Sequence, residues 1–243
     1  MIFTSKPKVK FYSSIPGVIE NYPIIKASSY KRKWTYNAAE AFKETTKNLQ
    51  NYQNTLTGVV KCPGVFDIMN SGWIVTAWCD FIIDVNRDYN TINWHVPPMM
   101  QSVTSGDDFN KPIITFISTQ NPAMSIPICG DDNHCLVKIH TPWTAEIPKG
   151  WSLLVLPVSY SDETRFKATE GILKPADHIE INPQLYWKVI HGTELVKAGT
   201  PLCQIIPVKD NDIDFECLDF SDEQRLNQKK MYFKRASTYV RKI

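Results

Sequence analysis

Histidines close to carboxylates are the residues of this chain best suited to chemistry. His178 and Glu180 are separated by a single residue, so both would lie on the same face of a strand. Imidazole and carboxylate together are typical ligands of non-haem iron. A divalent metal site is therefore an alternative, with candidate ligands His140, His178, Glu180 and His191. The competing interpretation is polar alternation along one solvent-facing strand, and under it no cofactor is predicted.

Other motifs for catalysis are weak or missing. A second group of metal-binding residue types comprises Cys129, Asp131, Asp132, His134, Cys135 and His140. Its cysteine and histidine spacing, C-x5-C-x4-H, matches no common zinc template. The chain has no G-x-S-x-G, GxGxxG or P-loop pattern. The sequence therefore does not favour nucleophilic catalysis or a classical nucleotide cradle.

The elements that must position these residues are mostly β-strands. Pro148-Lys149-Gly150 and Ala198-Gly199-Thr200-Pro201 are turn sequences, and an apolar strand follows each. We predict a mainly β single domain, of the jelly-roll, β-sandwich or β-clip-like type, over residues 58–220. An N-terminal arm and helix, residues 1–57, precede it as a helical insertion. A basic C-terminal helix and tail, residues 221–243, follow it within one structural unit.

Local patterns give more detailed expectations. Asn37 and Glu40 have the spacing of a capping box and predict a helix over residues 37–52. The stretch that includes Cys62 is predicted to be short and extended. Residues 73–85 are apolar enough to form one buried strand with a kink near Asp80. The tryptophans expected in the core or in a pocket wall are Trp73, Trp78, Trp143 and Trp151.

Net charge, apolar runs and cysteine content indicate which partners and which cellular compartment to expect. Its formal net charge is only +2, which gives no general reason to expect nucleic acid or membrane as a partner. No apolar run approaches the roughly 18 residues of a membrane helix. The first residues lack the apolar segment of a signal peptide, so secretion by that route is not expected. The six cysteines are predicted to be reduced thiols, with disulfides as the alternative.

The C-terminal segment has its own charge pattern. Residues 221–224, Ser-Asp-Glu-Gln, form a capping box before a predicted helix. Tyr232 and Phe233 stand among its basic residues, a mixture that can bind nucleic acid. The candidate nucleic-acid contacts are Lys229, Lys230, Lys234 and Arg235. An amphipathic helix that packs on the β domain is the favoured interpretation, so nucleic acid is not the expected partner.

Residues 142–207 are similar in layout to the β-clip group of dUTPases and dCTP deaminases. Gly171, Gly199 and Gln204 match that layout. The phosphate-binding motif of the group is replaced here by residues 160–164, Tyr-Ser-Asp-Glu-Thr. The water-activating Asp and the base-reading Tyr are also missing, so the layout does not imply dUTPase activity.

A wider resemblance runs through nearly the whole chain. Its motifs are Val9-Lys10-Phe11-Tyr12, Trp34, Val60-Lys61-Cys62-Pro63-Gly64-Val65-Phe66-Asp67, Ser71-Gly72-Trp73-Ile74, Trp78-Cys79-Asp80, Pro142-Trp143, Pro148-Lys149-Gly150-Trp151-Ser152, Gly171-Ile172 and Gly199-Thr200-Pro201. In these motifs the chain resembles a family of uncharacterised proteins common in tailed, often marine, bacteriophages. The resemblance implies a phage-linked origin and a place in the host cytoplasm or the virion.

The resemblance brings no activity with it. The leading expectation is therefore a non-catalytic binding or structural and assembly protein. Its partner would be a second copy of the chain or another phage or host protein. The alternatives are a metal-dependent enzyme of the cupin or oxygenase type and a nucleotide-binding β-clip protein that lacks the dUTPase catalytic motifs.

Overall fold

A computed structural model describes the chain in two compact units, Met1–Asp210 and Asn211–Ile243. The described residues are 6–47, 62–86, 91–98, 113–117, 135–175, 179–189, 191–210, 213–214, 216–217, 219 and 221–240.

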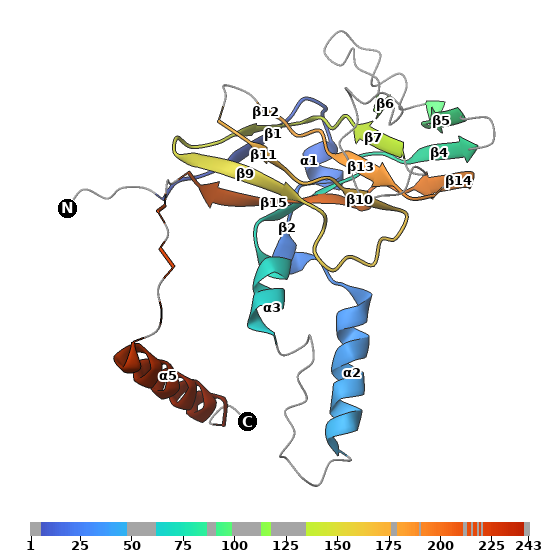
Figure 1. Cartoon of the computed structure of the whole chain (residues 1–243). Coiled ribbons are helices and arrows are strands. Elements are labelled where there is room, and N and C mark those ends of the chain that lie inside the picture. The colour runs from blue at the N-terminus through green and yellow to red at the C-terminus, as the bar shows by residue number, and fades with distance from the viewer. Residues whose placement is uncertain are drawn as a thin grey trace. The chain divides into compact units, whose positions relative to one another are not determined.

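The first unit is mainly antiparallel β-structure (Figure 1). One sheet has the strand order β1 (Lys10–Ser13), β8 (Trp143–Glu146) and β12 (Ile179–Glu180). A second has the order β10 (Phe166–Ala168), β13 (Gln184–Trp187), β7 (Cys135–Ile139) and β6 (Ile114–Ile117). A third has the order β11 (Gly171–Leu173), β9 (Trp151–Leu156), β15 (Pro201–Lys209), β3 (Trp73–Thr76) and β2 (Ile25–Lys26). The fourth has the order β14 (His191–Val196), β4 (Phe81–Asn86) and β5 (Thr91–His95).

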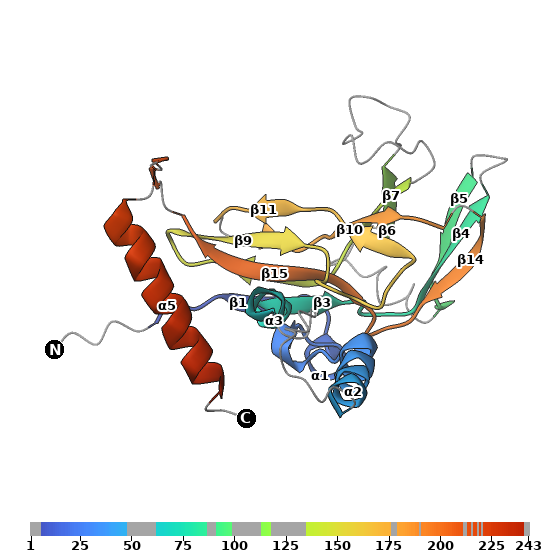
Figure 2. The ribbon, with the colours of Figure 1, turned by 60° about the horizontal axis from the view of Figure 1, so that its bottom comes forward.

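Short helical segments accompany the strands of the first unit. They are α1 (Val18–Asn21), the 3-10 turn η1 (Ala27–Ser29), α2 (Lys33–Lys47) and α3 (Pro63–Asn70). Figure 2 shows α1, α2 and α3 gathered near β3. The predicted mainly β fold with an N-terminal helical insertion is confirmed, and its packed sheets are consistent with a β-sandwich.

The core of the first unit forms because strand residues alternate between buried and less buried positions. Strand β4 shows this alternation along its whole length, with Phe81, Ile83 and Val85 buried. The same core cluster contains Trp143 and Trp187. Burial of large apolar side chains is the main source of stability in such a fold. The core thereby fixes the sheets against one another.

Strand β15 is the strand that organises the third sheet. It pairs antiparallel with β3 on one side and with β9 on the other. Gly72, which precedes β3, has φ +69° and approaches β15 closely. A Cβ atom at this position would lie 2.0 Å from the Ile205 carbonyl oxygen. Only glycine therefore fits this junction.

Three local expectations are wrong. Residues 73–85 form two strands, β3 and β4, in different sheets, rather than one kinked strand. Helix α2 begins at Lys33, not at Asn37, because the Asp162 carboxylate accepts the Lys33 N–H at 2.8 Å and so caps the helix from afar. Pro63 starts α3 instead of an extended segment, since proline suits the first turn of a helix.

The second unit contains helix α5 (Asp222–Val240). The predicted capping box is confirmed: the Ser221 N–H donates to Gln224 Oε1 at 2.8 Å, and the Gln224 N–H donates to Ser221 Oγ at 3.2 Å. Side chains 221–232 are exposed, including the apolar Leu226 and Met231. None of the helices in the described ranges is both long and apolar enough to cross a membrane.

Candidate functional site

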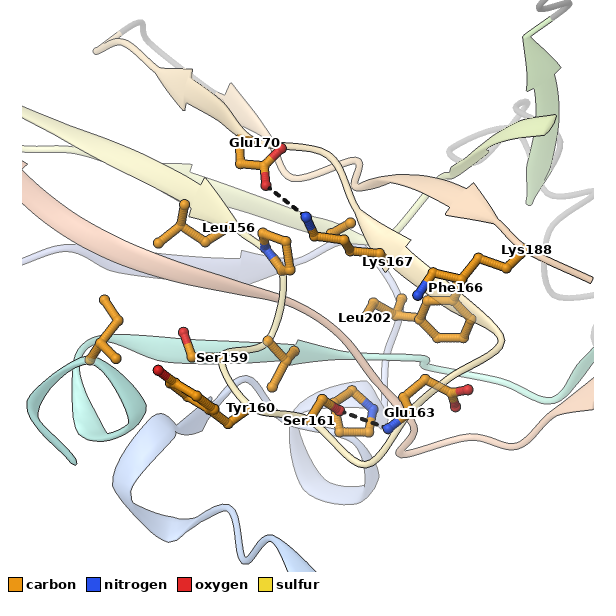
Figure 3. A pocket seen from close by; sticks show the side chains of 15 residues that line it. Leu156, Ser159, Tyr160, Ser161, Glu163, Phe166, Lys167, Glu170, Lys188 and Leu202 are labelled. Atoms are coloured by element: carbon orange, nitrogen blue, oxygen red, sulfur yellow. Dashed lines mark hydrogen bonds and ion pairs between the residues drawn. The ribbon is translucent and has the colours of Figure 1, made fainter. Parts of the chain in front are cut away.

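A cavity of about 520 Å³ lies where the loop between β9 and β10 meets the start of β15 (Figure 3). We call it the β9–β10 pocket. Residues 156–161 and 166–168 supply most of its wall, and Pro201 and Leu202 add the beginning of β15. Val158, Phe166, Ala168 and Leu202 are buried. The pocket therefore has an apolar floor.

The loop from Pro157 to Arg165 is held in place by a buried arginine. Arg32 is 3% exposed, and its Nε donates to the Ser159 carbonyl at 2.7 Å. Its Nη2 donates to the Met69 carbonyl at 3.2 Å and its Nη1 to the Tyr30 carbonyl at 3.3 Å. Desolvation by burial lowers the pKa of Arg32. The guanidinium thus binds three backbone segments together, with the Tyr30 ring 5.0 Å from its carbon.

Two further contacts fix the same loop to α2. Trp34 Nε1 donates to the Tyr160 carbonyl at 2.7 Å, and the Lys33 N–H donates to the Asp162 carboxylate at 2.8 Å. Tyr160 has φ +55°, a left-handed conformation that is costly for a residue other than glycine. The hydrogen bonds on both sides hold this conformation. The Tyr160 ring, 48% exposed, is consequently presented at the pocket.

The fully buried amide of Gln204 joins the loop to β15 and to α3. Its Oε1 accepts the Ser159 N–H at 3.0 Å. Its Nε2 donates to the carbonyls of Ile68 and Ser71 at 2.7 and 2.8 Å. Three separate segments therefore meet at one side chain. These bonds satisfy backbone groups of the pocket loop and of α3 from within the fold.

The charged side chains of the pocket differ in whether they form an ion pair. Arg165 binds Glu163 with two hydrogen bonds of 2.9 and 2.6 Å. Burial alone would raise the pKa of Glu163, but its hydrogen bonds with Arg165 lower the pKa overall. Lys167 pairs with Glu170 at 3.3 Å. Within the described part of the chain, the exposed Lys188 ammonium makes no ion pair, so it is the uncompensated charge of the pocket.

The three predicted metal ligands that the structure describes lie on or directly after strands of three different sheets. His140 is buried directly after β7, Glu180 is exposed on β12, and His191 is exposed on β14. His178 lies outside the described residues, as does the segment 129–134 of the second cluster. Among the described side chains, no three of His, Cys, Asp or Glu are grouped as a metal site requires. The metal site stays a prediction, and elemental analysis of protein purified without chelator tests it.

The four tryptophans lie in or beside the core. Trp78 and Trp143 are buried, and Trp78 Nε1 donates to the His140 carbonyl at 3.2 Å. Trp73 and Trp151 are partly buried against the core, with the Trp73 ring 5.3 Å from that of Phe11. None of the four lines the β9–β10 pocket.

The candidate nucleic-acid contacts lie on α5. Lys229 and Lys230 are exposed there. The side chains of Lys234 and Arg235 lie outside those described, although their backbone is helical. Their role in binding stays a prediction.

The sequence did not single out the residues that line the pocket. Tyr160, Glu163, Lys167 and Lys188 carry no recognisable motif. The sequence resemblance did mark residues 160–164, which were expected to stand in the place of the phosphate motif of the β-clip layout. The partner segments, however, come from distant parts of the sequence.

Comparison with known proteins adds no family. No protein-family model matches the chain, and no curated protein matches it. The class that the fold defines is a mainly β, sandwich-like protein.

Proposed function

We propose that this protein is a non-catalytic, phage-associated binding or assembly protein that contacts its partner at the β9–β10 pocket. The partner is a second copy of the chain or another phage or host protein. The phage association and the place in host cytoplasm or virion rest on the sequence resemblance. The pocket supplies the structural support for a binding role.

The observation that carries the proposal is the combination of a fixed wall with an apolar floor. Arg32 and Gln204 hold the loop before any ligand arrives, so little conformational freedom is lost on binding. The floor residues Phe166 and Leu202 supply apolar area of the kind that anchors a partner side chain. Glu163 is locked by Arg165 and kept ionised, which suits a structural group better than a proton donor.

A photo-crosslinking amino acid at position 160 tests the proposal. Ile172 is the matched control, because it is 56% exposed against 48% for Tyr160 and does not line the pocket. We expect a discrete product, identified by mass spectrometry, from position 160 and none from position 172. The Leu156→Trp substitution, which fills the pocket with a larger side chain, should abolish the crosslinked product from position 160. Equal products at both positions, or a product that survives L156W, would contradict a contact at the pocket.

A nucleotide-binding role is the second candidate, favoured by the position of the loop. Residues 160–164 line or border the pocket and stand where the β-clip layout has its phosphate motif. A thermal-shift titration with nucleoside mono- and triphosphates tests this role. A rise in melting temperature that Lys188→Ala removes would support it, and a flat response would exclude it.

A further inference from the structure

We infer that the β9–β10 pocket recognises an acidic peptide segment of its partner, in which an apolar or aromatic side chain stands next to a carboxylate. This inference rests on the proposed binding function and specifies the chemistry of the partner. It follows from the floor, the charges and the rim of the pocket.

The apolar floor of the pocket favours a ligand with an apolar side chain, here called the anchor, that inserts into the cavity. Val158, Phe166, Ala168 and Leu202 are each at most 8% exposed, yet they line the cavity. Its volume of about 520 Å³ exceeds that of a single large side chain. Burial of an aromatic side chain on such a floor contributes favourable free energy in proportion to the apolar area removed from water.

The charged side chains of the pocket favour a ligand with one negative group next to the anchor side chain. Glu163 and Glu170 are already paired with Arg165 and Lys167, whereas Lys188 is uncompensated among the described residues. Figure 3 shows Lys188 extending beside Phe166, so a carboxylate near the anchor would meet its ammonium. Because Arg165 and Lys167 already neutralise the two glutamates, Lys188 leaves the pocket with one net positive charge, which the several charges of a polyanion would exceed. A single carboxylate therefore fits better than a triphosphate.

The rim favours a polypeptide over a small molecule. Tyr160, Lys167 and Lys188 line the cavity and are exposed to solvent. Small-molecule sites enclose most of their ligand, whereas an exposed rim around an apolar floor suits an anchor side chain on a longer chain. The Trp34 ring lies 6.0 Å from Tyr160 and extends the apolar surface beyond the cavity.

Titration of the full-length, ¹⁵N-labelled protein with short capped peptides tests the inference. The probes are Gly-Phe-Glu-Gly, Gly-Phe-Gln-Gly and Gly-Ala-Glu-Gly, followed by amide chemical shifts, a measurement that detects weak binding. We expect shifts at residues 156–168, apart from Pro157, with the Phe-Glu peptide. The other two should bind on the order of fivefold more weakly, the equivalent of one partly exposed ion pair or part of an apolar contact.

Charge reversal gives the decisive comparison. Lys188→Glu should bind the Phe-Glu peptide at least about tenfold more weakly and should prefer a Gly-Phe-Lys-Gly peptide. Lys149→Glu, an exposed change in the turn before β9, should leave the preference unchanged. Both lysines are exposed, so both variants should fold, and melting curves check this.

The inference would be overturned by equal binding of the Phe-Glu and Phe-Gln peptides, by no shift in the loop, or by a nucleoside triphosphate that displaces the peptide. Crosslinking at position 160 distinguishes this failure from a failure of the proposed function. A crosslinked partner without preference for Phe-Glu would refute the acidic segment alone. If neither a crosslink at position 160 nor a preference for the Phe-Glu peptide is observed, the pocket is not a binding site.

Discussion

The side-chain carbonyl of Gln204 accepts the backbone N–H of Ser159 across 3.0 Å, so that β15 and the pocket loop share one buried amide. The same side chain donates to the carbonyls of Ile68 and Ser71. Its place at the meeting of three segments links the stability of the fold to the shape of the β9–β10 pocket.

Replacement of this amide should be costly. Gln204→Ala leaves one N–H and two carbonyls without their partner in a buried place, and we expect a loss of about 3 kcal/mol in the free energy of unfolding. Urea denaturation measures it. Gln228→Ala, at an exposed position of α5, is the control and should change stability by less than about 0.5 kcal/mol. Similar losses in both variants would show that the Gln204 amide does not join the segments.

The Glu163–Arg165 ion pair should make the stability of the fold depend on pH. Because the pKa of Glu163 in the folded protein is lowered, the pair stabilises the fold above the unfolded pKa of about 4.3. That stabilisation is lost as pH falls through the folded pKa. Glu163→Gln should therefore lower the melting temperature at neutral pH and narrow its difference from the wild type below about pH 4. A difference that persists unchanged in acid would contradict the ion pair.

Glycine at position 72 should be indispensable. Gly72→Ala forces a Cβ against the Ile205 carbonyl and holds a non-glycine residue at positive φ, so we expect more than about 2 kcal/mol of destabilisation. Gly64→Ala is the matched control, since a Cβ there meets nothing within 4 Å and the residue lies in α3. It should be neutral or stabilise by up to about 1 kcal/mol. The prediction fails if the two variants melt alike.

The buried cysteines should be inert in the native protein. Desolvation raises the pKa of Cys79 and of Cys203 to about 12, so almost no thiolate is present at neutral pH. Cys62 and Cys217 are exposed. Alkylation with iodoacetamide followed by peptide mapping should label the exposed pair first and the buried pair only after denaturation. Native labelling of Cys203 at the rate of Cys62 would contradict its burial.

Strands β9 and β15 could be predicted because their signals are local. The turns at Pro148–Gly150 and Ala198–Pro201 precede β9 and β15 as expected. The start of α2 could not be predicted, because its cap, Asp162, lies 129 residues away from Lys33. A distant side chain leaves no trace in a local pattern.

The pocket could not be predicted from the sequence because its wall is built from segments that are distant along the chain. Leu156 and Pro201 come together only because β9 pairs with β15, and Lys188 approaches because β13 pairs with β10. Such pairing depends on the packing of whole sheets rather than on spacing along the chain. Of the histidines that the sequence marked, His140 follows β7 and His191 begins β14, and these strands belong to different sheets.

Strand β15 also determines how the first unit would respond to a mechanical load. It lies between β3 and β9 and is followed by the second unit. A force applied along its axis through the C-terminal segment would load the hydrogen bonds to both neighbours in shear, so they would have to break together rather than one after another. The C-terminal end of β15 would therefore resist a pull along the strand more strongly than a pull across it.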